Sequence, residues 1–121
     1  MTPGIYNFPP VKQGATFKFQ FNWQDEALAT VDLTGYSARL SVGYENSTLA
    51  NVLEVNTAGA ASKRIVLGGT PFNIVGVVDK ATMLALTPGN YVWDLELTSP
   101  SGEDYALLTG RFPLLASKVG V

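Results

Sequence analysis

The sequence predicts an all-β fold, most simply an antiparallel β-sandwich of about seven or eight short strands with one short connecting helix. Three observations favour this class. Short segments alternate between apolar and polar residues, clusters of Gly, Pro, Asn, Asp and Ser separate them, and they recur at a spacing of roughly ten residues. The length of 121 residues fits one domain, which we place at 1–121.

The first predicted strand has the clearest period of two. In residues 15–23, four aromatic side chains alternate with polar ones, whereas a helix would spread them around its circumference. A half-buried strand places all four on one face, where they can pack against the aromatic residues of the last hairpin. We therefore assign these four residues to the core: Phe17, Phe19, Phe21 and Trp23.

The middle of the chain predicts a loop and four further strands. Residues 24–35 are expected to form a polar loop that ends in a type I turn, with Asp32 at its first position and Gly35 at its last. Residues 36–44 alternate again and place Leu40 in the core, while Gly43 indicates a bulge or a close approach by another backbone. Shorter strands are expected within 51–56, 63–69 and 71–78.

One helix and a hairpin complete the predicted fold. Asp79 can cap the start of a helix within 79–89, and Pro88 followed by glycine can end it. Residues 90–98 and 103–112 alternate on either side of a Ser-Pro-Ser-Gly turn. The apolar face of the first of these strands supplies the remaining predicted core residues: Tyr91, Trp93 and Leu95.

Four carboxylates on the final hairpin raise the question of a catalytic site. They are Asp94, Glu96, Glu103 and Asp104, and the chain contains no histidine and no cysteine to work beside them. A glycosidase would need two carboxylates facing each other across a cleft. The simpler interpretation is a solvated sheet face whose acids pair with basic residues on neighbouring strands. We expect no catalytic residue, no cofactor and no metal site.

The charge pattern argues against two large classes of partner. Eight Lys and Arg residues against ten Asp and Glu residues give a net charge of −2, and the basic residues are scattered. Binding to DNA or RNA requires a clustered basic surface, so we expect no nucleic-acid partner. No apolar run approaches the roughly 20 residues that cross a bilayer, so we expect no membrane partner. The first ten residues lack the pattern of a signal peptide.

Three longer stretches resemble a family of small virion proteins of tailed bacteriophages. These stretches are "NFPPVKQGATFKFQFNW", "VDLTGYSARLSV" and "LTPGNYVWDLELTSPSGEDYALLTGRF". They are similar to accessory tail proteins and to the N-terminal domain of baseplate upper proteins, in the same order and over most of the chain. The matching positions are 14–17, 32–40 and 88–110. Ala15 departs from the family pattern, which tends to have an acid there.

The resemblance implies an immunoglobulin-like β-sandwich that serves as a non-enzymatic building block of the virion. It implies an assembly or adaptor module in the tail, neck or baseplate, which contacts other virion proteins and forms a homo-oligomer on the particle. Baseplate upper proteins continue into a receptor-binding part, whereas this sequence stops at Val121, so we expect an adaptor rather than a receptor binder. A capsid decoration protein is the nearest alternative.

The two ends of the chain are the expected contact segments. We predict an extended N-terminal arm at 1–13 and a C-terminal tail at 113–121, because added strands and arms commonly join subunits. The candidate partner-binding residues are Ile5, Tyr6, Phe8, Leu114 and Leu115.

Two other functions remain open from the sequence. A carbohydrate-binding module would need exposed aromatic residues on one face, for which Tyr44, Phe72 and Tyr105 are the candidates. A carboxylate-dependent hydrolase would depend on Glu96 and is the weakest alternative.

Overall fold

A computed structural model describes residues 4–44 and 51–116 and confirms the all-β prediction. Seven longer strands match the predicted segments, and two strands of two residues each lie in the predicted N-terminal arm. In chain order the elements are β1 (Gly4–Ile5), β2 (Val11–Lys12), β3 (Phe17–Phe21), β4 (Ser37–Gly43), β5 (Leu53–Asn56), β6 (Lys63–Leu67), β7 (Ile74–Val78), α1 (Lys80–Leu84), β8 (Gly89–Thr98) and β9 (Asp104–Leu115).

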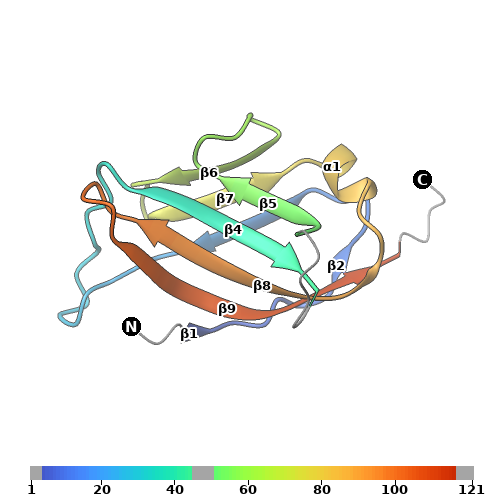
Figure 1. The fold of residues 1–121 in the computed structure, drawn as a ribbon, viewed down its shortest axis with the longest axis horizontal. Coiled ribbons are helices and arrows are strands. Elements are labelled where there is room, and N and C mark those ends of the chain that lie inside the picture. Colours follow the sequence, from blue (N-terminus) through green and yellow to red (C-terminus); the bar gives the residue numbers. More distant parts are fainter. Residues whose placement is uncertain (1–3, 45–50, 117–121) are drawn as a thin grey trace.

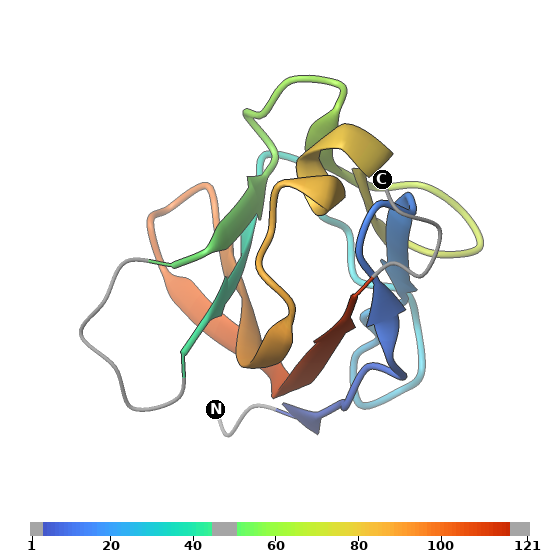
Figure 2. The same ribbon diagram turned by 90° about the vertical axis from the view of Figure 1, so that its right-hand side faces the viewer.

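The strands form one sheet that curls around a core. Their order is β1-β9-β8-β4-β5-β6-β7-β3, and β2 also pairs with β9. The pairs are antiparallel, except that β1 and β2 run parallel to β9 and β5 runs parallel to β6. In the described residues, one residue pair, Asn56 with Arg64, joins β5 to β6. The sheet is therefore nearly divided there, and β4, β8 and β9 face β3, β6 and β7, as Figure 1 and Figure 2 show.

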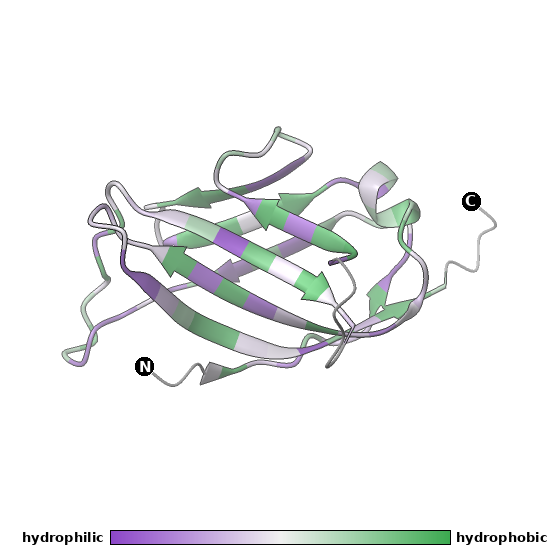
Figure 3. Cartoon of the chain, in the orientation of Figure 1, coloured by the Kyte–Doolittle hydropathy of each residue, from purple (hydrophilic) through white to green (hydrophobic). Residues whose placement is uncertain are grey.

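The long hairpin of β8 and β9 has the two faces that the sequence predicts. Along β8, Tyr91, Trp93, Leu95 and Leu97 are buried, whereas the residues between them are exposed or partly exposed. Hydropathy alternates along β4 and β8 accordingly (Figure 3). A register shift between Leu95 and Glu96 marks a bulge in the pairing with β9.

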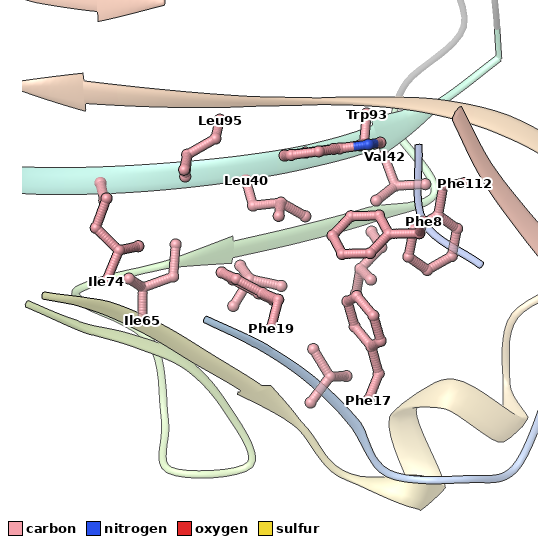
Figure 4. Close-up of a cluster of buried hydrophobic side chains, with 14 of the residues drawn as sticks. Phe8, Phe17, Phe19, Leu40, Val42, Ile65, Ile74, Trp93, Leu95 and Phe112 are labelled. Atoms are coloured by element: carbon pink, nitrogen blue, oxygen red, sulfur yellow. The ribbon is translucent and has the colours of Figure 1, made fainter. Parts of the chain in front are cut away.

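Aromatic and branched side chains from both halves of the sheet fill the core. Figure 4 shows Phe17 and Phe19 of β3 facing Leu40 of β4 and Trp93 of β8. Six of the eight predicted core residues are buried, and Phe21 and Trp23 are partly buried and pack against them. Phe21 stacks on Trp93, with the two ring planes 8° apart and the centroids 5.9 Å apart. The six buried residues are Phe17, Phe19, Leu40, Tyr91, Trp93 and Leu95.

Two local predictions need correction, namely the position of the turn before β4 and the end of the helix. In the turn before β4 the Tyr36 N–H donates to the Leu33 carbonyl, so the turn begins one residue later than expected. Gly35 occupies its third position with a φ of +79°, a conformation that favours glycine and is typical of a type II turn. Asp32 instead accepts a hydrogen bond from the Thr34 N–H just before the turn.

The helix begins as predicted but ends earlier. The Thr82 N–H donates to Asp79 Oδ1 over 2.9 Å, which caps the first turn. The last helical residue is Leu84, because a further turn would need an N–H from Pro88 for the Leu84 carbonyl, and proline has none. The Gln13 side-chain amide donates to the carbonyls of Leu84 (3.1 Å) and Leu86 (2.9 Å) instead.

Asn73 is a buried polar residue that the sequence analysis did not single out. Its side chain accepts from the Trp23 N–H at 2.8 Å and donates to the carbonyls of Trp23 (3.0 Å) and Val31 (3.2 Å). A buried amide needs such partners, because leaving a buried polar group unpaired costs about 1–3 kcal/mol. Asn73 thereby fixes the base of the loop that follows β3, where residues 23 and 31 lie.

Within residues 4–44 and 51–116, no helix is long and apolar enough to cross a membrane.

The two faces of β8 predict opposite mutational effects. Trp93→Ala should lower the free energy of unfolding by about 3–5 kcal/mol, because it leaves a large cavity in the core. Asp94→Asn should change it by no more than about 0.5 kcal/mol, because this side chain lies on the outer face. Urea unfolding of the two variants measures both values, and a large loss in Asp94→Asn with a small loss in Trp93→Ala would contradict the assignment of the faces.

Candidate functional site

Three of the four carboxylates of the final hairpin make local pairs on its surface. Glu96 lies opposite Arg39 in the register of β4 and β8, and their charged groups are 3.4 Å apart. Asp104 accepts from the Thr98 hydroxyl at 2.7 Å, and Glu103 accepts from the Tyr105 hydroxyl at 3.0 Å. An exposed ion pair such as that of Arg39 with Glu96 contributes roughly 0–1 kcal/mol to stability. The pair of Glu96 with Arg39 joins an acid to a basic residue on the neighbouring strand, as the sequence predicts.

Asp94 has a pKa above its ordinary value. Neighbouring groups on the sheet remove part of its hydration and raise its pKa, and the positive charge of Arg39 offsets part of that increase. Its side chain is nevertheless exposed, so the raised pKa does not indicate a buried catalytic acid. In the described part of the chain, no three acidic residues gather where they could hold a metal ion.

The N-terminal segment lies against its own domain along residues 108–115 of β9. Beyond the strand pairs of β1 and β2, the Tyr6 N–H donates to the Thr109 carbonyl (2.8 Å) and the Phe8 N–H to the Arg111 carbonyl (3.0 Å). The Arg111 N–H donates back to Asn7 Oδ1 at 3.0 Å. Pro9 and Pro10, which have no N–H, occupy the interval between β1 and β2 where the pairing is interrupted.

Trp93 and Gly110 fix where this segment crosses the hairpin. The Trp93 indole N–H donates to the Tyr6 carbonyl over 2.9 Å. Gly110 lies opposite Trp93 in the register, and a Cβ at this position would stand 1.8 Å from the Tyr6 carbonyl oxygen. Only glycine therefore allows the N-terminal backbone to approach closely enough to accept this bond.

The predicted partner-binding residues divide into two groups. Phe8 and Leu114 are core residues with 8% and 2% of their surface exposed, so their assignment to partner contacts is wrong. Alternation along the two paired segments turns these side chains inward. Ile5, Tyr6 and Leu115 remain on the surface. Likewise, residues 113–115 belong to β9 and not to a tail, while residues 117–121 lie outside the described part of the chain.

A groove runs between the N-terminal segment and β3. It has a volume of about 650 Å³, and residues 6, 8–12 and 15–21 line it; we call it the β3 groove. Its lining is apolar or neutral apart from two exposed lysines, Lys12 and Lys18. In the described part of the chain neither lysine forms an ion pair. The β3 groove is therefore a basic and apolar surface on a protein whose net charge is negative.

The β3 groove also contains a free sheet edge. β3 is the last strand in the order, and β7 is its one partner among the described strands. Every second residue of an antiparallel strand directs its N–H and C=O away from its partner, so β3 presents unpaired backbone groups. Such an edge is a template on which another chain can pair. Lys18 on the exposed side of this edge is a charged residue of the kind that keeps edges from pairing indiscriminately.

A smaller hollow of about 430 Å³ continues from the β3 groove, with Phe21 in both linings. Leu107 and Leu108 of β9 line its other side, and Asp25 and Leu28 form its rim. Nearby, the buried Asn22 Oδ1 has no hydrogen-bond partner. This hollow is apolar but carries an acid and no basic residue.

Two of the aromatic residues considered for sugar binding, Tyr44 and Tyr105, lie near opposite ends of β8. Tyr44 follows the end of β4 that pairs with Val92, whereas Tyr105 pairs with Leu97. Val92 and Leu97 are five positions apart on β8, which corresponds to roughly 17 Å along the strand. Tyr105 packs against Trp23 with ring centroids 5.8 Å apart, so its ring is engaged within the domain.

Comparison with protein-family models gives no match for the chain. No curated protein matches it either.

The crossing at Gly110 gives a specific prediction. Gly110→Ala should displace residues 4–8 from β9, because the added methyl group overlaps the Tyr6 carbonyl. Limited proteolysis should then cut the N-terminal segment at least about tenfold faster than in the unchanged protein, while urea unfolding still shows one folded domain. Gly89→Ala is the matched control, because a Cβ there would come no closer than 3.7 Å to its nearest neighbour and Gly89 does not have a positive φ. Equal cleavage rates in the Gly110→Ala variant and the unchanged protein would contradict the crossing.

Proposed function

We propose that this protein is a non-enzymatic structural component of a tailed-phage virion, acting as an assembly or adaptor module in the tail, neck or baseplate. It would anchor neighbouring subunits or fibres and occur there as a homo-oligomer. The observation that carries the proposal is the free edge of β3 beside the basic and apolar β3 groove. A surface of this kind suits the docking of an extended protein segment.

The strand connectivity supports the finer fold assignment within this proposal. In an immunoglobulin-like sandwich, two antiparallel sheets pack face to face through a core of alternating residues. Here β9-β8-β4-β5 and β6-β7-β3 form the two halves, and they are joined at one residue pair. We propose that the fold is immunoglobulin-like, with the N-terminal segment as an additional strand beside β9. The phage-protein resemblance of the sequence implies the same arrangement.

A capsid decoration protein is the second candidate, because it would use the same kind of surface on the outside of the head. Glycan binding has less support, since Tyr44 and Tyr105 lie far apart along the sheet. Arg39 pairs with Glu96, the residue on which a hydrolase would depend, so nothing in this arrangement favours catalysis.

Immunogold labelling of phage particles from the source tests the proposal. We expect an antibody raised against residues 4–116 to label the tail, neck or baseplate of intact or disrupted particles. Label over the whole head would favour the decoration protein. Mass spectrometry of purified, disrupted particles is the independent measurement, and absence of the protein from them would contradict any virion role.

A further inference from the structure

The loop that follows β3 is a rigid hairpin with an apolar tip. The Val31 N–H donates to the Trp23 carbonyl at 3.0 Å, and the Asp25 N–H donates to the Ala29 carbonyl at 2.9 Å. Asp25 Oδ1 accepts from the N–H groups of Ala27 (2.9 Å) and Ala29 (3.0 Å). These bonds hold residues 25–29, which we call the Leu28 loop, in one conformation.

Leu28 occupies a position of this loop that favours glycine. Its φ is +64°, and it follows the turn closed by the bond from its own N–H to the Asp25 carbonyl. The third position of a three-residue hairpin loop adopts this conformation and is usually glycine, because a side chain there is strained. Yet Leu28 is 74% exposed, so its side chain gains little burial within its own domain. The backbone outlier at this exposed residue is the observation that supports a hypothesis of contact outside the domain.

Charge decides which surface of a second copy fits this loop. The Leu28 loop carries Asp25 and Glu26 and no basic residue. The β3 groove carries Lys12 and Lys18 and no acid. The smaller hollow beside the loop carries Asp25 itself, so a second acidic loop would be repelled there. The β3 groove is both the larger of the two spaces and the one of opposite charge.

The contact must join two molecules. Lys18 and Asp25 are seven positions apart in the sequence, and an extended chain over seven positions spans roughly 23 Å. In Figure 1 the light-blue loop after β3 projects at one end of the long axis, whereas β2, which lines the β3 groove, lies toward the other end. The loop therefore cannot reach the lysines of its own groove.

We propose that copies of this chain associate head to tail, with the Leu28 loop of one molecule seated in the β3 groove of the next. Leu28 enters the apolar lining, and Asp25 and Glu26 face Lys12 and Lys18. Such a contact is heterologous, so repetition produces a closed ring or an open filament. This inference rests on the proposed function, for which it names the contact between copies. Its test uses purified protein without particles, so its failure can be told apart from a failure of the proposed function.

Single variants test the two halves of the contact. Sedimentation velocity over a wide concentration range should show self-association of the unchanged protein, weakened by added salt. Leu28→Asp and Lys18→Glu should each weaken the association by at least about tenfold. The matched controls are Val66→Asp, at another exposed apolar residue, and Lys80→Glu, at another exposed lysine; both should associate like the unchanged protein. Unchanged protein that stays monomeric, or either loop or groove variant that associates normally, overturns the proposal.

Leu28→Gly separates loss of the contact from loss of folding. Glycine relieves the backbone strain, so this variant should melt about 4 °C higher and still lose the association. A lower melting temperature, or retained association, would count against the role given to Leu28.

Mixing the two defective variants tests the direction of the contact. Leu28→Asp keeps an intact groove, and Lys18→Glu keeps an intact loop. A mixture should therefore form a complex of one copy of each, although neither variant associates alone. A symmetric contact, in which each molecule uses its loop and its groove at once, would not be restored by mixing, and that result would overturn the head-to-tail arrangement.

Discussion

The indole N–H of Trp93 needs a hydrogen-bond acceptor inside the core. The N-terminal segment provides that acceptor, and this bond determines how the segment is arranged. The ring is buried among Phe8, Phe21 and its strand neighbours, where an unpaired donor would be costly. The Tyr6 carbonyl supplies the acceptor, and the missing side chain of Gly110 lets it come close. Phe8 then enters the core two residues later, so the segment is held by both a polar bond and apolar burial.

This arrangement also sets the position of the surface that we assign to function. Because residues 4–13 pair with β9 and not with β3, β3 at the other end of the sheet has β7 as its one strand partner in the described residues. The β3 groove lies between the N-terminal segment and β3, and it combines a backbone edge, aromatic walls and two lysines. The segment that the sequence suggested as a free arm is thus one wall of the groove. A docking chain would meet a preformed surface, which reduces the ordering that binding requires.

The sequence predicts the parts of this fold that depend on neighbours along the chain. A period of two identifies β3, β4 and β8, and Asp79 identifies the helix start. It does not predict that residue 7 binds residue 111, because no local pattern encodes a contact across 104 positions. For the same reason the roles of Asn73 and Gly110 were missed. Pro9 and Pro10 cannot donate ladder hydrogen bonds, and the pairing with β9 resumes after them.

The surface that we propose for interaction was the least predictable feature. Lys18 alternates with buried phenylalanines and looks like any solvated strand residue. Leu28 lies in a polar loop, and its φ is set by hydrogen bonds that the sequence does not specify. Alternation correctly separates the inner from the outer face of a strand. It says nothing about which strand is left at the edge, and that is the property on which the proposed function depends.

Hydrogen exchange under native conditions tests the central claim most directly. If the Trp93 and Tyr6 bond makes the N-terminal segment part of the cooperative fold, the amides of Tyr6, Phe8 and Gln13 should exchange as slowly as those in the middle of β8, through the same unfolding reaction. Exchange of these three amides orders of magnitude faster than β8 would contradict the account. The segment would then be an arm that detaches from a domain already complete without it.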